Sequence, residues 1–335
     1  MPYIVDDYIL HQIELERVKN GIVAQVLKTL DKADAAVKRQ ILKTEGVYTK
    51  KRYSEISSYI KEQSVLLKKK IQEDFDLESF IDYEINSQIK ILKKHTGKAF
   101  VSFTFPGAAQ VVSSALFRPL TGNTTFQSYL DSVSGQLFST WESAVRTGYL
   151  LGTTGKDICR QVLGAYAKNA EVADAGAIGT LRKSLALNTR TALQSFANEA
   201  RTMVLERNSR MFSGYQWVAT LDSRSCLVCG NLDGEIRPSL KDFPHIPLHH
   251  NCRCLIIPIL KGFEDLLYDG MRESENGEVD GKLTYVVWLQ RQPEDVQKNI
   301  LGRSRFEFYK AGGKISSFVD DGRTLTLAEL KSKNT

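Results

Sequence analysis

WVATLDSRSCLVCGNLDGEIRPSLKDFPHIPLHHNCRCLIIP, residues 217–258, holds four of the chain's five cysteines and three of its five histidines. Cys226 and Cys229 form a C-x-x-C pair, and an H-H-N-C-R-C run follows at 249–254. Thiolate and imidazole ligands at this spacing are what a tetrahedral zinc ion requires. The stretch therefore predicts a small module held together by a metal ion.

This cysteine-rich stretch admits several chemical uses. A structural zinc site is favoured, because four protein ligands saturate the ion. A disulfide pair would need an exported protein, and a catalytic metal would need an open coordination position. A redox C-x-x-C is disfavoured because no βαβ pattern surrounds it. Spacing leaves open which four of five candidates bind, and we favour the first three with one of the last two: Cys226, Cys229, His249, Cys252 and Cys254.

Composition is that of a soluble globular chain. The 335 residues are 42% hydrophobic, which is ample for a core, and the length allows two or three domains. There is no apolar run long enough for a transmembrane helix, and the N-terminus MPYIVDDYILHQIELERVKNG is typical of an amphipathic helix, not of a signal peptide. Without export the cysteines stay reduced, which favours metal over disulfide. The net charge of +6 is compatible with nucleic-acid contact, but an ordinary basic protein explains it more simply.

Helical periodicity dominates the chain outside the module. Apolar residues recur every three to four positions over 8–42, 54–95, 125–147 and 174–210, with an aspartate-rich interruption at 74–76. A short helix is expected at DICRQVLGAYA, where the isolated Cys159 is expected to be a core residue. Residues 99–124 lack this periodicity and predict either a short strand with an apolar helix or a loop.

The module itself is expected to be a small β structure. Strands are predicted at 218–221 and 254–260, and Asp233-Gly234 predicts a tight turn with a returning strand ending at Ile236. The predicted fold is mainly α, with a long helical body, a small zinc-stapled β module and a helical C-terminal segment. The corresponding ranges are 1–98 for the N-terminal amphipathic helices, 99–213 for the helical body, 214–262 for the Cys/His module and 263–335 for the C-terminal segment.

Several residues of the module are expected to have structural roles. Asp222 is expected to cap the cysteine knuckle through backbone N–H groups, and Gly234 to supply a positive φ in the turn. Arg253, between two candidate ligands, is expected to bridge to Asp222 or Asp233. Trp217 and Trp288 are expected to be core anchors that pack the module and the C-terminal segment together.

The module and the tail resemble the phage Mu F-like family of phage head morphogenesis (minor head) proteins. The resemblance is carried by W-V-A-T-L-D-S-R-S-C-x-x-C, N-L-D-G and P-L-H-H-N-C-R-C. In that family a strand ending in an aspartate precedes a ligand-like pair, an x-L-D-G turn follows, and a histidine with C-R-C closes the module. In this chain the aspartate is Asp222 and the ligand-like pair is Cys226 and Cys229. The turn is 232–234, and the closing residues are His249 and 252–254. The segments 284–306 and 324–330 resemble the family's tail, so the likeness extends over about 125–330.

The resemblance implies a structural protein, not an enzyme. It implies a minor component of a tailed-phage head that acts at or near the portal in capsid assembly and in DNA packaging or ejection. The implied partners are the portal protein or the major capsid protein, with double-stranded DNA as a further contact and no membrane. The implied location is the host cytoplasm during assembly and then the virion.

Alternative functions use some of the same residues. A metal-dependent nuclease would draw on the histidines and aspartates near the cysteines, but the histidines follow Pro244 and Pro247 too closely to act as a base and as separate ligands. The E-x-E sequence at 273–275 occurs in ADP-ribosyltransferases, although an exposed acidic loop explains it more simply. A DNA-binding module would bind phosphates in a salt-dependent way through Arg224, Arg237, Lys241, Arg303 and Arg305.

Overall fold

The computed structural model describes residues 4–43, 49–97, 102–163, 176–262, 270–320 and 322–333. The architecture is mainly helical, with small sheets in the C-terminal part near the Cys/His cluster, as the sequence predicts. Among the helices in these ranges, none combines the length and the apolarity that crossing a bilayer requires. The start predicted for the long helix, at 174–175, and the end of the predicted short helix, at 164–167, lie outside the described residues.

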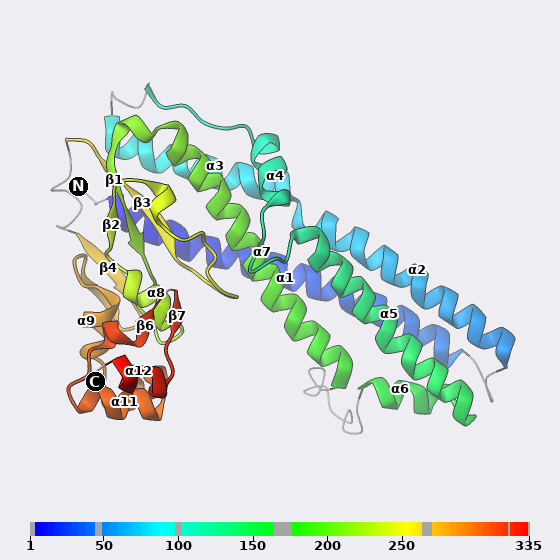
Figure 1. The fold of residues 1–335 in the computed structure, drawn as a ribbon. Helices are drawn as coiled ribbons and strands as arrows, with labels where there is room; N and C mark the ends of the chain where they lie inside the picture. The colour runs from blue at the N-terminus through cyan, green and yellow to red at the C-terminus, as the bar shows by residue number, and fades with distance from the viewer. Residues whose placement is uncertain are drawn as a thin grey trace. The chain divides into compact units, whose positions relative to one another are not determined.

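The chain divides into two compact units, each built from discontinuous segments. Unit 1 comprises Met1–Leu15, Asp82–Val111 and Ala197–Thr335, and unit 2 comprises Glu16–Ile81 and Val112–Phe196. The chain passes from one unit to the other inside four helices: α1 (Ile4–Leu42), α3 (Leu77–Thr96), α4 (Ala108–Phe117) and α7 (Gly176–Arg207) (Figure 1). The four contiguous domain ranges predicted from the sequence, 1–98, 99–213, 214–262 and 263–335, stay predictions.

Unit 2 is built from amphipathic helices whose apolar stripes are buried. Besides parts of α1, α3, α4 and α7, it contains α2 (Lys50–Phe75), α5 (Phe126–Leu151) and α6 (Gly155–Leu163). Helix α5 packs along α2 and contacts α6. The predicted stripe of α2 is buried at Ile56, Ile60 and Ile71, and the buried Trp141 of α5 donates its Nε1–H to Asp34 of α1 at 2.9 Å. The predicted helices at 8–42, 54–95 and 125–147 are confirmed.

Local signals set the ends of these helices. Asp76 has left-handed backbone angles (φ 37°, ψ 60°) and separates α2 from α3, so the predicted interruption at 74–76 is confirmed. Thr125 and Ser128 form a capping box at the start of α5, where each side chain bonds the other residue's backbone N–H. In the region 102–124, the apolar helix α4 is present, and the described residues there form no strand beyond an isolated bridge between Thr121 and Thr124.

Unit 1 contains a three-stranded antiparallel sheet in the order β2-β1-β3. The strands are β1 (Phe212–Val218), β2 (Ile236–Arg237) and β3 (Leu255–Leu260). The predicted turn is present, since Gly234 has φ +85°. The strand predicted at 218–221 is wrong: β1 ends at Val218, because the Asp233 side chain, and no neighbouring strand, accepts the N–H of Ala219 at 2.7 Å. Between β1 and the turn, residues 227–232 form helix α8 (Leu227–Leu232), which the sequence did not predict.

The C-terminal segment of unit 1 is a set of short elements around a second core, which also includes Leu221 and Leu227 of the module. They are β4 (Met271–Ser274), β5 (Gly277–Asp280), α9 (Tyr285–Gln290), α10 (Glu294–Leu301), α11 (Arg303–Lys310), β6 (Val319–Asp320), β7 (Arg323–Thr324) and α12 (Leu327–Lys333). Trp288 is buried in this core, whereas Trp217 is buried in the core under the three-stranded sheet. Both tryptophans are core anchors as predicted. The Trp288 cluster also contains Leu221 and Leu227 of the module, so Trp288 packs the module and the C-terminal segment together as predicted, whereas Trp217 lies in the separate cluster under the sheet.

Candidate metal centre

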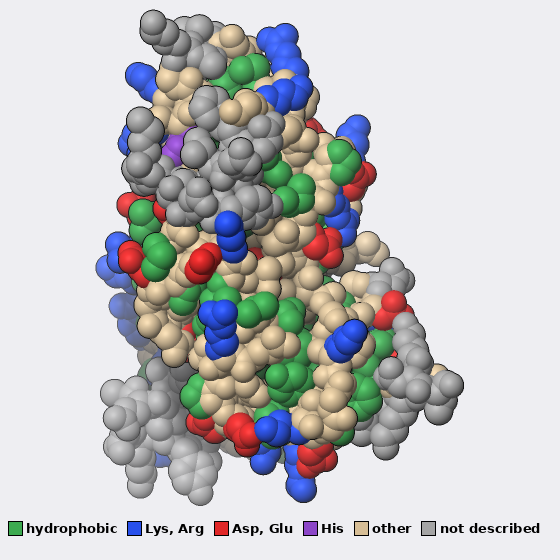
Figure 2. Space-filling model, turned by 90° about the vertical axis from the view of Figure 1, so that its left-hand side faces the viewer, with side chains coloured by type: hydrophobic (Ala, Val, Ile, Leu, Met, Phe, Trp, Pro, Cys, Tyr) green, Lys and Arg blue, Asp and Glu red, His purple; other side chains and the backbone are tan. Residues whose placement is uncertain are grey.

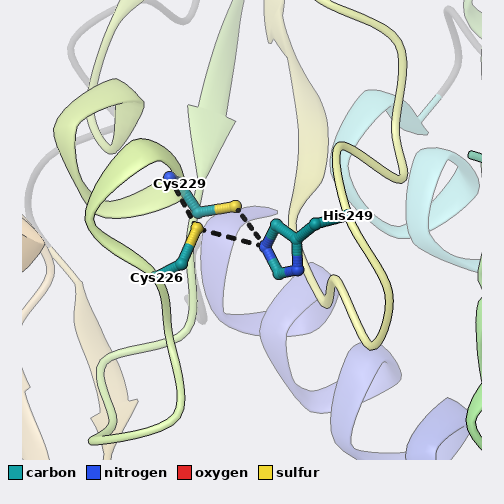
Figure 3. A group of neighbouring side chains, drawn as sticks. All are labelled: Cys226, Cys229 and His249. Carbon is teal, nitrogen blue, oxygen red and sulfur yellow. Dashed lines mark hydrogen bonds between the residues drawn. The ribbon is translucent and has the colours of Figure 1, made fainter. Parts of the chain in front are cut away.

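The C-x-x-C pair lies at the start of helix α8. Cys226 is the residue that caps the helix, and its Sγ accepts a hydrogen bond from the backbone N–H of Cys229 at 3.4 Å. Cys226 is half-buried and Cys229 is buried. Both sulfur atoms face the segment that carries His249 (Figure 3). The helix start therefore provides the knuckle that the spacing predicts.

His249 presents one defined ring nitrogen to the two cysteines. Its Nδ1 lies 2.8 Å from the backbone carbonyl oxygen of His250. Because a carbonyl oxygen only accepts, Nδ1 carries a proton and Nε2 is the atom free to bind a metal. Nε2 lies 3.2 Å from Sγ of Cys226 and 3.1 Å from Sγ of Cys229 (Figure 3). A hydrogen bond from the other ring nitrogen to a carbonyl oxygen is the usual way in which a metal-binding histidine is held in orientation.

The structure brings all five candidate ligands together in two overlapping groups. Cys226, Cys229 and His249 form one group, and Cys229, Cys252 and Cys254 form the other. Within each group the donor atoms lie within 4.8 Å of one another, and the sulfur atoms of Cys229 and Cys252 are 3.9 Å apart. Ligands about 2.0–2.3 Å from a tetrahedral zinc ion lie at comparable mutual distances. The cluster is thus compatible with a metal ion, and Cys229 belongs to both groups.

The charges of the cluster favour a cation. Hydrogen bonding by Cys229, opposed by burial and aided by His249, lowers the pKa of the Cys226 thiol to about 4. The hydrogen bond to Cys226 raises the pKa of His249 to about 9. The pKa of Cys229 is raised, first by Cys226 and next by Cys252, because adjacent sulfur atoms resist ionising together. A metal ion would stabilise several thiolates at once and would take the place of the Nε2 proton.

The remaining histidines and cysteine of the sequence lie outside the two groups. His245 and His250 are exposed, and His250 contributes its backbone carbonyl to the orientation of His249. Cys159 is buried in α6 of unit 2, as predicted for a core residue, and burial raises the pKa of its thiol to about 11. All five cysteines are free thiols.

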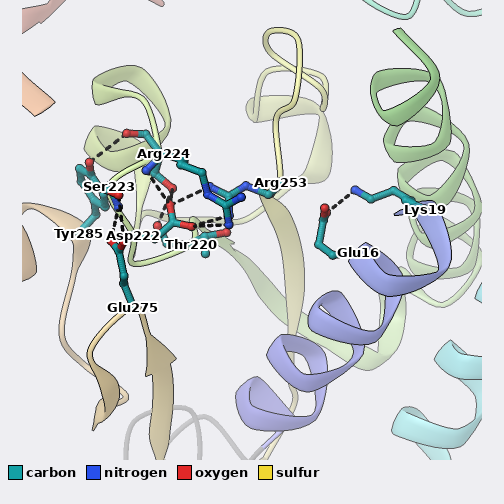
Figure 4. Close-up of polar contacts among 10 residues, drawn as sticks. Glu16, Lys19, Thr220, Asp222, Ser223, Arg224, Arg253, Glu275 and Tyr285 are labelled. Carbon is teal, nitrogen blue, oxygen red and sulfur yellow. Dashed lines mark hydrogen bonds and ion pairs between the residues drawn. The ribbon is translucent and has the colours of Figure 1, made fainter. Parts of the chain in front are cut away.

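A bidentate ion pair links the two cysteine segments. Arg253 donates from Nη1 to Oδ2 of Asp222 at 2.5 Å and from Nη2 to Oδ1 at 2.7 Å (Figure 4). The Oδ1 atom also accepts the backbone N–H of Arg224 and the hydroxyl of Ser225. Asp222 therefore caps the loop that leads to Cys226, and the predicted bridge from Arg253 is made to Asp222. Burial opposes ionisation of Asp222, but the hydrogen bonds and charge of Arg253 hold its pKa below the usual value.

Replacing Asp222 by asparagine is expected to lower the free energy of unfolding by about 1.5–3 kcal/mol at pH 7, because Arg253 loses its charged acceptor. The folded-state pKa of Asp222 lies below the unfolded value of about 3.9. Its contribution is therefore present above that value and is lost as the pH falls through the folded pKa. Urea unfolding at pH 7 and pH 3 measures this difference. The exposed Asp295→Asn is the control, expected within about 0.5 kcal/mol of wild type. An equal penalty for Asp222→Asn at both pH values would contradict the assignment.

Asp233 is a second buried carboxylate, and it joins the module to the C-terminal segment. It accepts the backbone N–H groups of Ala219 and Tyr285, each at 2.7 Å, and Nη1 of Arg272 at 3.0 Å. Arg272 also donates to the backbone carbonyls of Ala219 and Leu283, at 2.5 and 3.0 Å. Sequence reasoning missed Arg272 and Tyr285. In the structure, Arg272 is buried in the short strand β4 between the exposed Met271 and the half-buried Glu273.

The E-x-E sequence at 273–275 runs into the exposed turn of a β-hairpin, so the expected exposed acidic segment is present, but as a hairpin and not as an irregular loop. It begins in β4, which pairs with β5 as an antiparallel hairpin. The carboxylate of Glu275 accepts the backbone N–H of Ser223 at 2.7 Å and its hydroxyl at 3.0 Å (Figure 4). Glu275 thus fixes the loop between Asp222 and the knuckle.

Gly230 in helix α8 allows a close approach between the module and the C-terminal segment. A Cβ atom at this position would lie 2.0 Å from the ring of Tyr285. The Tyr285 ring is buried, and its hydroxyl donates to the Ser225 carbonyl at 2.9 Å. The ring is therefore fixed on two sides and has little freedom to move away from a larger residue.

Gly230→Ala is expected to lower the free energy of unfolding by about 1–3 kcal/mol, the usual cost of overpacking. The matched control is Gly135→Ala in α5, where nothing lies within 4 Å of the added Cβ. That exposed helix-interior change is expected to stabilise the protein by about 0.5–1 kcal/mol. Thermal or urea unfolding of both variants provides the measurement. Two alanine variants of equal stability would show that Tyr285 tolerates the added methyl group.

The basic residues considered for DNA contact are mostly engaged within the chain. Their recorded contacts are Arg224 with Asp222, Arg237 with Glu235 and the ring of Phe243, Arg303 with Glu307, and Arg305 with the Leu325 carbonyl; Lys241 is exposed. On the face drawn in Figure 2, lysine and arginine side chains are interspersed with acidic ones. Mixed charge of this kind attracts a polyanion less than a single-sign patch does.

Comparison with known proteins adds no relative. No protein-family model, no curated protein and no solved structure matches this chain.

Proposed function

We propose that the Cys/His cluster binds one zinc ion in a structural role. The observation that carries this proposal is the donor set: thiols and one imidazole whose Nε2 faces the sulfur atoms, gathered in two groups that share Cys229. Thiolate-rich sites of this kind select zinc, and four protein ligands close the coordination sphere. The module around the cluster has a two-residue strand at one sheet edge, so an ion that joins α8 to the 249–254 segment would contribute directly to folding.

We further propose that the protein is a minor head protein of a tailed phage, acting at or near the portal. The support for this proposal is that the residues that carry the resemblance also hold the module together. Asp222 follows the end of strand β1, Gly234 forms the turn, and Arg253 between two candidate ligands closes onto Asp222. The proposed partners are the portal protein or the major capsid protein, with double-stranded DNA as a further contact. The proposed location is the virion, after assembly in the host cytoplasm.

A structural role, and not hydrolysis, is proposed for the module. A metal-dependent nuclease needs carboxylates that are free to bind a metal or to act as a base. Here Asp222 accepts two bonds from Arg253, and Asp233 accepts from Arg272 and two backbone N–H groups. Both carboxylates near the cysteines therefore hold the module together.

The test is association with the portal protein and the major capsid protein encoded in the same genome. A tagged chain is co-expressed with each of them, and copurification and copy number are measured together with zinc content. Stable association with the portal at few copies per head is expected. Association with neither protein would overturn the head-protein proposal. Magnesium- or manganese-dependent cleavage of duplex DNA that is lost in His250→Ala would make the module an active site instead, since this exposed side chain is not needed to hold the fold.

A further inference from the structure

A groove of about 700 Å³ lies in the C-terminal segment, away from the residues of the metal cluster. Residues of α9 and α10 line one part of it, and the end of α11 with the following loop to Ser316 lines the rest. Neither the metal cluster nor the proposed zinc site uses this groove. Its chemistry can be derived from three features: a buried amide, a glycine turn between two lysines, and an apolar wall.

The buried amide is that of Gln297, which is 6% exposed and lines the groove. Its Nε2 donates to the backbone carbonyls of Gln290 and Gln292, at 3.0 and 2.8 Å. Two carbonyl acceptors on the same atom identify that atom as the nitrogen, so the amide cannot be flipped. The other atom, Oε1, accepts no hydrogen bond from the described residues and is not among the buried atoms that lack a partner. The groove therefore contains one carbonyl acceptor that is held in a fixed position and can accept a hydrogen bond from a ligand.

The glycine turn fixes two lysines at the groove. Gly312 has φ +99°, and a Cβ atom on Gly313 would lie 2.1 Å from the ring of Phe308, so both positions require glycine. Lys310 precedes this turn and pairs with Glu294 across the groove, whereas the exposed Lys314 follows it. Of the charged side chains that line the groove, Glu294 offsets Lys310, so the groove has a net positive charge that comes from Lys314. A ligand that fits it has a negatively charged group close to Lys314.

The apolar wall consists of Val286, Tyr309 and Ile315. A ligand that satisfies all three features needs an N–H donor, a carboxylate and apolar atoms within a short length. An extended peptide with an acidic side chain supplies them together, since its backbone N–H can meet Oε1 of Gln297. A nucleic-acid backbone fits less well, because it carries no N–H donor for Oε1 of Gln297.

We propose that this groove binds an extended segment of a partner protein through an aspartate or glutamate side chain of that segment. The inference goes beyond the proposed head-protein role and does not depend on it, since it rests on the groove alone. Lys314 binds the acidic side chain, Gln297 binds the peptide backbone, and the apolar wall contacts the neighbouring residue.

The experiment uses the full-length protein and immobilised seven-residue peptides with a central aspartate, asparagine or lysine. Aspartate peptides are expected to bind selectively, and Lys314→Ala is expected to weaken them roughly tenfold, the effect of one charged hydrogen bond. Lys298→Ala is the matched control, because Lys298 is an exposed lysine of α10 that does not line the groove. Both substitutions are on the surface, so a folding defect does not confuse the comparison.

Three outcomes would overturn the proposal. One is that no aspartate peptide binds, and another is equal binding of aspartate, asparagine and lysine peptides. The third is an equal loss in the Lys314 and Lys298 variants, which would indicate a general charge effect. A duplex oligonucleotide is tested in parallel, and binding of DNA in place of peptides with dependence on Lys314 would reassign the groove to nucleic acid.

Discussion

Cys229→Ser is expected to remove the metal ion and to produce the largest loss of stability of any single change in the module. Cys229 is the one donor common to both groups of candidate ligands, so its replacement leaves neither group complete. Structural zinc contributes on the order of 10 kcal/mol to the folding of small zinc domains. We therefore expect metal affinity to fall by more than roughly a hundredfold and the melting temperature to fall by about 10 °C or more.

The measurement combines metal analysis of the purified variant with calorimetry before and after chelation. Wild type is expected to lose stability on chelation, whereas Cys229→Ser is expected to be insensitive to it. Cys159→Ala, which changes the one cysteine outside the cluster, should retain the metal. Cys254→Ser is expected to have a smaller effect, because Cys254 belongs to one group only. A Cys229→Ser variant that keeps its metal and its melting temperature would refute the structural-metal proposal.

Glu84→Gln is expected to lower the free energy of unfolding by about 3–5 kcal/mol, the usual cost of breaking a buried ion pair from one side. Glu84 is fully buried on α3, and its carboxylate lies 2.7 Å from Nε2 of His11 and 2.9 Å from Nη2 of Arg201. Gln88 donates to the same carboxylate at 2.8 Å. The substitution leaves the guanidinium of Arg201, which is 1% exposed, without a counter-charge.

The pH dependence of this effect follows from the same contacts. Burial alone would disfavour the charged carboxylate, but Arg201 and His11 lower the pKa of Glu84 to about 2. The contribution of Glu84 is therefore complete above the unfolded pKa of about 4.3 and is lost as the pH falls through about 2. Denaturant unfolding between pH 7 and pH 2 should show the penalty of Glu84→Gln shrinking on acidification. Glu78→Gln, an exposed change on the same helix, is the control, and a similar small penalty in both variants would contradict a buried ion pair.

The helices and the cysteine cluster were predictable because each has a strong local signal. Apolar spacing located α1, α2, α3 and α5, and the two short cysteine segments, at 226–229 and 249–254, located the ligands. A bridge from Arg253 to Asp222 or Asp233 was predictable because Arg253 lies between two residues that must face the cluster, and the structure shows that the partner is Asp222. In each case the deciding information is contained within a short segment.

Features that depend on distant segments were not predictable. The end of β1 is set by the side chain of Asp233, and the partner Arg272 comes from a later hairpin. The buried network of His11, Glu84 and Arg201 joins three helices, although polar residues in a helical pattern normally indicate the exposed face. A periodic pattern does not show which polar side chains will find a partner in the interior.

The passage of the chain between the two units has a consequence for anyone who wishes to shorten the protein. Each of the four junctions, between residues 15 and 16, 81 and 82, 111 and 112, and 196 and 197, falls within a described helix. A protease that cleaves exposed, flexible backbone meets hydrogen-bonded helical turns at every one of them. Neither unit is a contiguous gene fragment, and a truncation at any junction would divide a helix. The roles of the two units are therefore best tested by point substitutions. Deleting either unit would also cut helices that belong to the other unit.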